Sequence, residues 1–129
     1  MATKLNADIS TNVDITCRKN DNLYLVATVK NSDDSIFDLT NYTLAEFLVL
    51  NSNDNTVRKF STANLTNSPP IYYNTIVRDV TLGTLSLNAI GGMMSIPEGS
   101  YNYTLKIIGA VNTVALITTV LHGKFKVID

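Results

Sequence analysis

The stretch from Ser95 to Val127 limits the possible folds more than any other part of the sequence. Every second residue of its first half is apolar or aromatic: Tyr101, Tyr103, Leu105 and Ile107. The residues between them are polar: Asn102, Thr104 and Lys106. A period of two is typical of a strand with one buried face. The second half is β-branched and apolar and then alternates again, so we expect the two halves to pair antiparallel as the core hairpin.

The composition predicts many short strands joined by polar loops. The chain has 129 residues, which fits one domain, and 45% of them are hydrophobic, which is enough for a core. It contains 16 threonines, which favour strands, and 15 asparagines, which favour turns.

Alternation marks the remaining strands, and turn residues separate them. The predicted strands before the hairpin are 13–18, 23–29, 44–50, 56–60, 71–80 and 84–88. Seven to eight strands of this length predict an all-β protein, an antiparallel β-sandwich. We expect residues 1–11 to form an extended N-terminal arm and residues 12–129 to form a single sandwich domain. Gly91–Met94 is expected to be a flexible connection.

Charge and apolar runs argue against several classes of protein. The net charge is −1, so no basic surplus favours nucleic-acid binding. The first ten residues lack the apolar core of a secretory signal. The longest apolar run, near Val114–Leu121, is shorter than the ~20 residues of a membrane-spanning helix. We therefore expect folding in a cytoplasm, with no direct contact to nucleic acid or membrane.

The residues that usually carry catalysis are sparse. His122 is the only histidine and Cys17 the only cysteine, so neither a histidine-rich metal site nor an intrachain disulfide can form. Cys17 is interpreted as a small buried residue and His122 as structural or surface. Glu46 and Glu98 are the only glutamates. We predict no catalytic, cofactor-binding or metal-binding residue, no cofactor, and no enzymatic activity.

Three irregular segments with apolar or aromatic content are the candidate contact regions. They are the arm, with Thr3, Lys4, Leu5 and Ile9; the loop, with Asn64, Leu65, Pro69, Pro70, Tyr72 and Tyr73; and the connection, with Met93 and Met94. Tyr72 and Tyr73 are adjacent, so in a strand they point to opposite faces, one into the core and one outward.

Several short motifs carry a resemblance when they are taken in order. They are an early strand at 14–21, the turn Phe37-Asp38-Leu39-Thr40-Asn41-Tyr42-Thr43, the segment Ile96-Pro97-Glu98-Gly99-Ser100-Tyr101-Asn102-Tyr103 and a terminal Gly123-Lys124-Phe125-Lys126-Val127. The chain resembles the immunoglobulin-like β-sandwich domains of tailed-bacteriophage virion proteins, such as the N-terminal domain of the baseplate upper protein family. Asn41 takes the place of a glycine that is usual in that turn, and asparagine tolerates the left-handed conformation.

The resemblance implies a non-enzymatic building block of a virion that assembles in the host cytoplasm. Its function would be that of a capsid auxiliary (decoration) protein or of a connector that anchors a fibre. Its partners would be other virion proteins, such as the major capsid, fibre, baseplate or neck proteins, in a symmetric assembly of many subunits. Two other classes stay open: a carbohydrate-binding or host-surface adhesion module, and a small enzyme whose site is not recognised.

Overall fold

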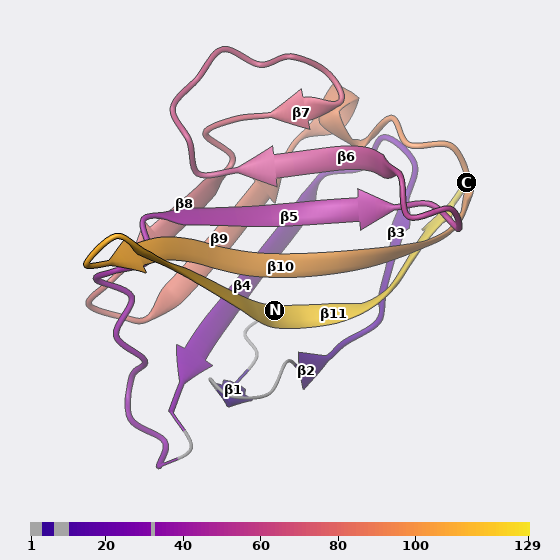
Figure 1. The fold of residues 1–129 in the computed structure, drawn as a ribbon. Coiled ribbons are helices and arrows are strands. Elements are labelled where there is room, and N and C mark those ends of the chain that lie inside the picture. Colours follow the sequence, from indigo (N-terminus) through magenta and orange to yellow (C-terminus); the bar gives the residue numbers. More distant parts are fainter. Residues whose placement is uncertain (1–3, 7–10, 32) are drawn as a thin grey trace.

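Side-chain alternation builds two β-sheets that pack face to face, with the core between them (Figure 1). The computed structural model describes residues 4–6, 11–31 and 33–129. The prediction of an all-β sandwich is confirmed, and most strand pairs are antiparallel. Within the described residues the strands number eleven, more than predicted, because three of them are only two or three residues long.

The smaller sheet has four strands. In spatial order they are β1 (Lys4–Asn6), β4 (Leu23–Lys30), β9 (Thr84–Ala89) and β8 (Ile76–Asp79). The backbone of β1 pairs parallel with Thr28–Lys30 at one edge of this sheet. Thr3 and Ile9 of the predicted arm lie outside the described residues. Packing of the arm on a neighbouring subunit stays a prediction.

The larger sheet has seven strands and contains the predicted hairpin. In spatial order they are β2 (Thr11–Asn12), β11 (Val114–Ile128), β10 (Gly99–Val111), β5 (Leu44–Leu50), β6 (Thr56–Ser61) and β7 (Ile71–Tyr72), and β3 (Ile15–Arg18) also pairs with β11. β10 and β11 pair antiparallel along their whole length, as predicted. The short strands β2 and β3 run parallel to β11 on its outer side.

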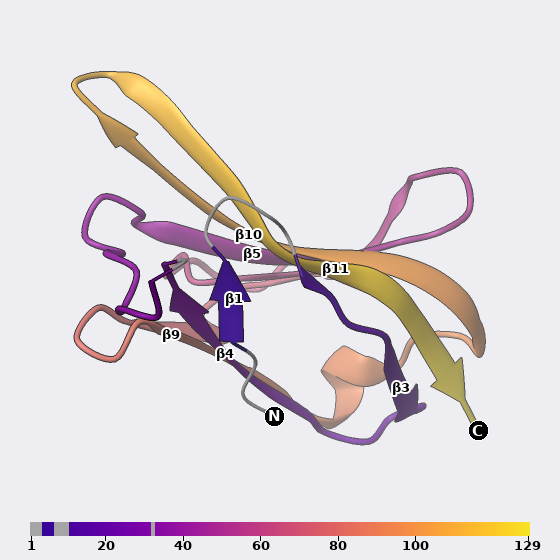
Figure 2. The same ribbon diagram turned by 90° about the horizontal axis from the view of Figure 1, so that it is seen from below.

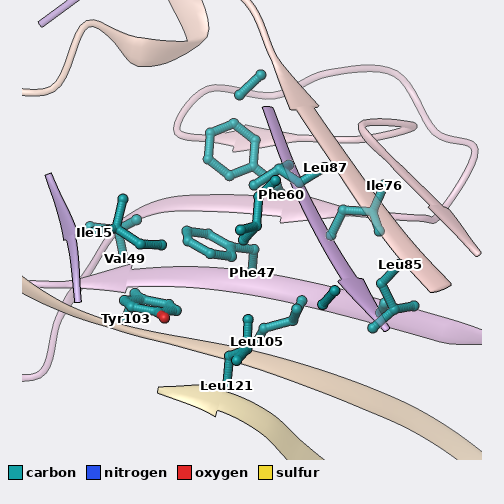
Figure 3. Close-up of a cluster of buried hydrophobic side chains, with 14 of the residues drawn as sticks. Ile15, Phe47, Val49, Phe60, Ile76, Leu85, Leu87, Tyr103, Leu105 and Leu121 are labelled. Atoms are coloured by element: carbon teal, nitrogen blue, oxygen red, sulfur yellow. The ribbon is translucent and has the colours of Figure 1, made fainter. Parts of the chain in front are cut away.

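The core holds the apolar face that the alternation predicts (Figure 3). Phe47 of β5 is central: its ring stacks on Tyr103 at 5.0 Å between centroids and meets Phe125 edge-on at 6.0 Å. Leu105 and Leu121 close the same layer across β10 and β11. Full burial of each such side chain contributes about 1.5–3 kcal/mol, so this cluster dominates the stability of the sandwich.

A β-bulge in the hairpin changes which side chains of β11 face the core. Leu105 pairs with Leu121, but the next residue, Lys106, pairs with Thr119, which leaves Val120 as an extra residue. A bulge places two residues opposite one and bends the strand. Val120 and Leu121 are consequently both buried although they are adjacent in sequence.

The predicted strand 71–80 is wrong in its continuity, because the chain passes there from one sheet to the other. β7 pairs with β6 in the larger sheet, whereas β8 pairs with β9 in the smaller sheet. Thr75 lies at the crossing: its N–H donates to the carbonyl of Ser61 on β6, and its carbonyl accepts from the N–H of Asn88 on β9. Asn74, with φ of 55°, makes the bend.

The predicted flexible connection is instead one turn of 3-10 helix, η1 (Gly91–Met94). It inserts the Met94 side chain into the core, where only 1% of it is exposed. This corrects the assignment of Met94 to a contact surface, since a buried thioether cannot meet a partner. Met93, the residue before it, is half-buried and packs against the core from outside.

The turn before β5 docks onto the hairpin. The Asp38 carboxylate accepts hydrogen bonds from the N–H and hydroxyl of Thr40, and these bonds lower the pKa of Asp38. The carbonyl of Asn41 accepts a hydrogen bond from the N–H of Ala110. Asn41 does not have a positive φ. The expectation of a left-handed conformation at Asn41 is therefore wrong, and the turn closes without a left-handed residue at this position.

Candidate functional site

A hollow of about 440 Å³ opens where the 62–75 loop meets η1, and we call it the asparagine hollow. Its lining has four asparagines and no charged side chain: Asn64, Leu65, Asn67, Tyr73, Asn74, Thr75, Asn88, Ile90 and Met93. These residues come from two segments of the chain, 64–75 and 88–93. Their carboxamides can both donate and accept hydrogen bonds.

Hydrogen bonds within the loop hold one wall of the asparagine hollow. The N–H of Tyr73 donates to the Asn67 side-chain oxygen at 2.7 Å, and the N–H of Asn74 donates to the carbonyl of Ala63 at 2.9 Å. The buried Thr75 hydroxyl accepts from the N–H of Ser61 at 3.2 Å and contacts the carbonyl of Tyr72 at 3.2 Å. The wall is therefore formed before any ligand or partner arrives.

Two of the three predicted contact segments meet at this hollow. Asn64, Leu65 and Tyr73 of the loop lie in its lining together with Met93 of the connection. Pro69 and Pro70 are exposed in the same loop but do not line the hollow. Of the predicted arm, the structure describes the backbone of β1, which lies at the opposite edge of the smaller sheet from β8.

Tyr72 and Tyr73 point to different sides, as their adjacency predicts. The Tyr72 ring stacks on Phe60 at 6.0 Å between centroids, and the guanidinium carbon of Arg58 lies 5.9 Å from the Tyr72 ring centre. Arg58 also donates to the carbonyls of Met93 and Ser95. Tyr72 is thus a packing residue, and Tyr73 is the tyrosine that faces the hollow.

A second hollow, of about 510 Å³, has a lining of mixed charge and lies beside residues 122–124 of β11. Asp14, Asp54, His122 and Lys124 are among its lining residues. The Asp14 carboxylate accepts a hydrogen bond from the N–H of Lys124 at 3.0 Å. Within the part of the chain that the structure describes, no three His, Cys, Asp or Glu side chains are grouped so that they could hold a metal ion.

The pKa values of Tyr103, which lines the second hollow, and of the half-buried Cys17 are both shifted. Burial raises the pKa of Tyr103 to about 12, and the charge of Asp14 adds to the shift; its hydroxyl donates to the carbonyl of Val13. Burial also raises the pKa of the half-buried Cys17 thiol, with a smaller contribution from Asp21. A raised pKa keeps the thiol protonated and weakly nucleophilic, which fits the structural role predicted for Cys17.

Sequence reasoning missed the apolar tip of the β10–β11 hairpin. We define the hairpin tip as residues 109–118, because β5 stops pairing with β10 at Ile108. Figure 2 shows this ribbon rising away from the rest of the sheet. Val114 is 64% exposed and Ile117 65% exposed, and Val111 is also exposed. The sequence feature that could have indicated this tip is the absence of any charged residue from Ile107 to Leu121.

Comparison with known proteins does not assign the chain to a family. No family model matches the chain, and no curated protein matches it. Among residues 4–6, 11–31 and 33–129, no helix is long and apolar enough to cross a membrane.

Proposed function

We propose that this chain is a non-enzymatic structural protein of a bacteriophage virion, with an immunoglobulin-like sandwich as its scaffold. It serves as a capsid auxiliary (decoration) protein or as a connector that anchors a fibre, and it acts through interfaces with other virion proteins. The motifs at Phe37–Thr43 and Ile96–Tyr103 support this proposal by their resemblance to such domains. The two-sheet, all-β fold supports the resemblance at the level of fold class.

The observation that carries the proposal is the distribution of exposed apolar side chains. Among the described residues ten large ones are exposed: Tyr24, Ile36, Leu65, Val77, Val80, Leu82, Ile90, Val111, Val114 and Ile117. Leu65 and Ile90 line the asparagine hollow. On the hairpin tip, Val111 and Val114 pair on one face, and Ile117 is exposed on the other. Gathered apolar surface that is exposed in a soluble chain is typical of protein–protein contact sites.

Mass spectrometry of purified phage particles tests the proposal directly. We expect the chain in the particles at a fixed ratio to the major capsid protein, because symmetric assemblies incorporate subunits in fixed numbers. Its absence from the particles, with the protein present in the host lysate, would contradict the proposal.

A matched pair of leucine variants then locates the contact. Leu65 and Leu82 have similar exposure, 62% and 58%, but Leu65 lines the asparagine hollow whereas Leu82 lies in the β8–β9 turn at the other end of those strands. We expect Leu65→Ser to reduce incorporation into particles and Leu82→Ser to leave it unchanged. Equal incorporation of both variants would rule out the hollow as the contact.

A second candidate function is a carbohydrate-binding or host-surface adhesion module, and the asparagine hollow favours it. Neutral amide groups can pair with sugar hydroxyls, and the Tyr73 ring offers a face on which a sugar can stack. This function predicts saturable binding of a glycan by the isolated chain, with binding lost in Tyr73→Ala. Tyr24→Ala is the control, because Tyr24 is exposed and lies outside the hollow. A glycan screen without any binder would exclude it.

A further inference from the structure

The outer edge of β11 is covered along only part of its length. β2 pairs with Leu121–His122 and β3 pairs with Phe125–Ile128 on that side. In the described part of the chain, no strand pairs there with residues 114–120, which we call the open edge. The other side of the ribbon is occupied, since Leu44 pairs with Ile108 and Asn41 accepts from Ala110. As far as residues 4–6, 11–31 and 33–129 are concerned, the open edge therefore presents a row of unpaired main-chain N–H and C=O groups.

The sequence of the open edge lacks the features that usually prevent edge-to-edge pairing. Natural edge strands are often protected by lysine, by proline or by a bulge within the strand. From Ile107 to Leu121 there is no charged residue and no proline, and valine, isoleucine and threonine predominate. The bulge at Val120 lies at the end of this segment, next to the part that β2 covers.

Both faces of the ribbon beside the open edge are apolar. Val111 pairs with Val114 on one face, and Ile108 pairs with Ile117 on the other. A strand added at this edge would be flanked by apolar side chains above and below, so main-chain hydrogen bonds and apolar burial would act together. Strand pairing over seven residues spans about 23 Å.

We infer that the occupant of the open edge is the open edge of a second copy of this chain, paired antiparallel across a two-fold axis near Ile117. A two-fold axis perpendicular to a sheet always brings a strand against its own copy in the antiparallel direction. A charged strand would meet its own charges in such a pair, but this segment carries none, so no like-charge repulsion opposes pairing with its own copy. The pairing joins two seven-stranded sheets into one. It goes beyond the proposed function, because it requires only the isolated chain.

Sedimentation velocity of the full chain over a range of concentrations tests this pairing. We expect the mass to rise from 14.1 kDa towards twice that value as the concentration increases. Ile117→Lys places a charge on both copies at the axis, so we expect dimerisation to weaken by about tenfold or more. Val77→Lys is the matched control: Val77 is 66% exposed, like Ile117 at 65%, but lies on β8 in the other sheet. The Val77→Lys variant should dimerise as strongly as the unaltered chain.

A chain that stays monomeric at every concentration would overturn the inference, as would dimers that Ile117→Lys and Val77→Lys weaken equally. Disulfide trapping is the second measurement, and it covers the case in which Ile117→Lys fails to fold. In a Cys17→Ser background, Ile117→Cys should give a covalent dimer under mild oxidation, faster than Val77→Cys, because the axis brings the two copies of position 117 together. Equal rates would contradict an axis at the open edge.

Discussion

The β10–β11 hairpin has two parts that both carry apolar side chains but differ in their surroundings: the hairpin tip, and the rest of the two strands (99–108 and 119–128), which we call the proximal half. In the proximal half, Tyr103, Leu105 and Leu121 are buried between the sheets. In the hairpin tip, Val114 and Ile117 are mostly exposed. The ladder between β10 and β11 continues through both halves. Beyond Ile108, β5 no longer pairs with β10. In the tip, Val114 lies on the face that carries the buried Ile107, and Ile117 lies on the opposite face, yet both are exposed. Alternation therefore assigns side chains to faces, but it does not report which part of a face is covered.

The largest loss of unfolding free energy should come from truncating a buried side chain in the proximal half. Phe125 is fully buried and contacts both Phe47 and Tyr103. We expect Phe125→Ala to lower the free energy of unfolding by about 3–5 kcal/mol, because it leaves a cavity in the core. Urea denaturation measures this loss. A loss below about 1 kcal/mol would mean that the proximal half is not the core of the sandwich.

Gly109 is where the two halves meet, and it should tolerate no side chain. A Cβ added there would lie 1.7 Å from the carbonyl oxygen of Asn41, so the docked turn would have to move. We expect Gly109→Ala to cost about 1–3 kcal/mol in unfolding free energy. Gly92→Ala is the control, since a Cβ there meets nothing within 4 Å. Equal stability of the two variants would show that the turn does not hold the base of the tip.

The buried hydroxyl of Tyr103 should make the stability of the folded chain depend on pH in the alkaline range. Its pKa is raised from 10.0 to about 12 in the folded chain, so the folded state retains a proton that the unfolded state loses. Stability should thus be unaffected by this group below pH 10 and fall as the pH rises from 10 through 12. Tyr103→Phe should lose about 1 kcal/mol at neutral pH, with its hydrogen bond to Val13. In the same variant, the part of the fall in unfolding free energy above pH 10 that Tyr103 causes should be absent.

Urea midpoints measured between neutral and alkaline pH give both quantities for Tyr103. Tyr24→Phe, at an exposed position, is the control and should keep the alkaline decrease. If Tyr103→Phe and the unaltered chain lost stability equally at high pH, titration of the buried hydroxyl would not be the cause.

The smallest effect is expected at the tip. Ile117→Ala in dilute solution should change the unfolding free energy by no more than about 0.5 kcal/mol, because the side chain is exposed there. Ile107→Ala, ten residues earlier and fully buried, should cost about 2–5 kcal/mol. A large loss in dilute Ile117→Ala would mean that the tip packs within its own chain and is not available to a partner.

Alternation predicted the individual strands well but could not place their neighbours. The bounds of β5, Leu44–Leu50, are those predicted, because burial on one face leaves a clear period of two. The 71–80 run looks continuous in sequence, yet Thr75 bonds to both sheets, and only the fold brings Ser61 and Asn88 to it. Met94 follows two glycines and looks like part of a loop, but the 3-10 turn directs it into the core.

The candidate surfaces show the same limit. Leu65, Tyr73 and Met93 could be found from the irregular, apolar segments that contain them, whereas Asn74 and Asn88 join the asparagine hollow only because the chain changes sheets at Thr75. Val114 lies on the same face as the buried Ile107 but is 64% exposed, and alternation within β10 and β11 does not report that. The absence of charge from Ile107 to Leu121 was the available signal.

Residue-resolved amide hydrogen exchange, measured at low and high protein concentration, tests most directly whether the two halves of the hairpin have different roles. We expect the amides of the proximal half, such as those of Leu105 and Phe125, to be protected at both concentrations. Protection of residues 114–120 should rise with concentration as a second copy covers the open edge. Protection of 114–120 that is already complete in the dilute monomer, or that never changes with concentration, would contradict a docking role for the tip.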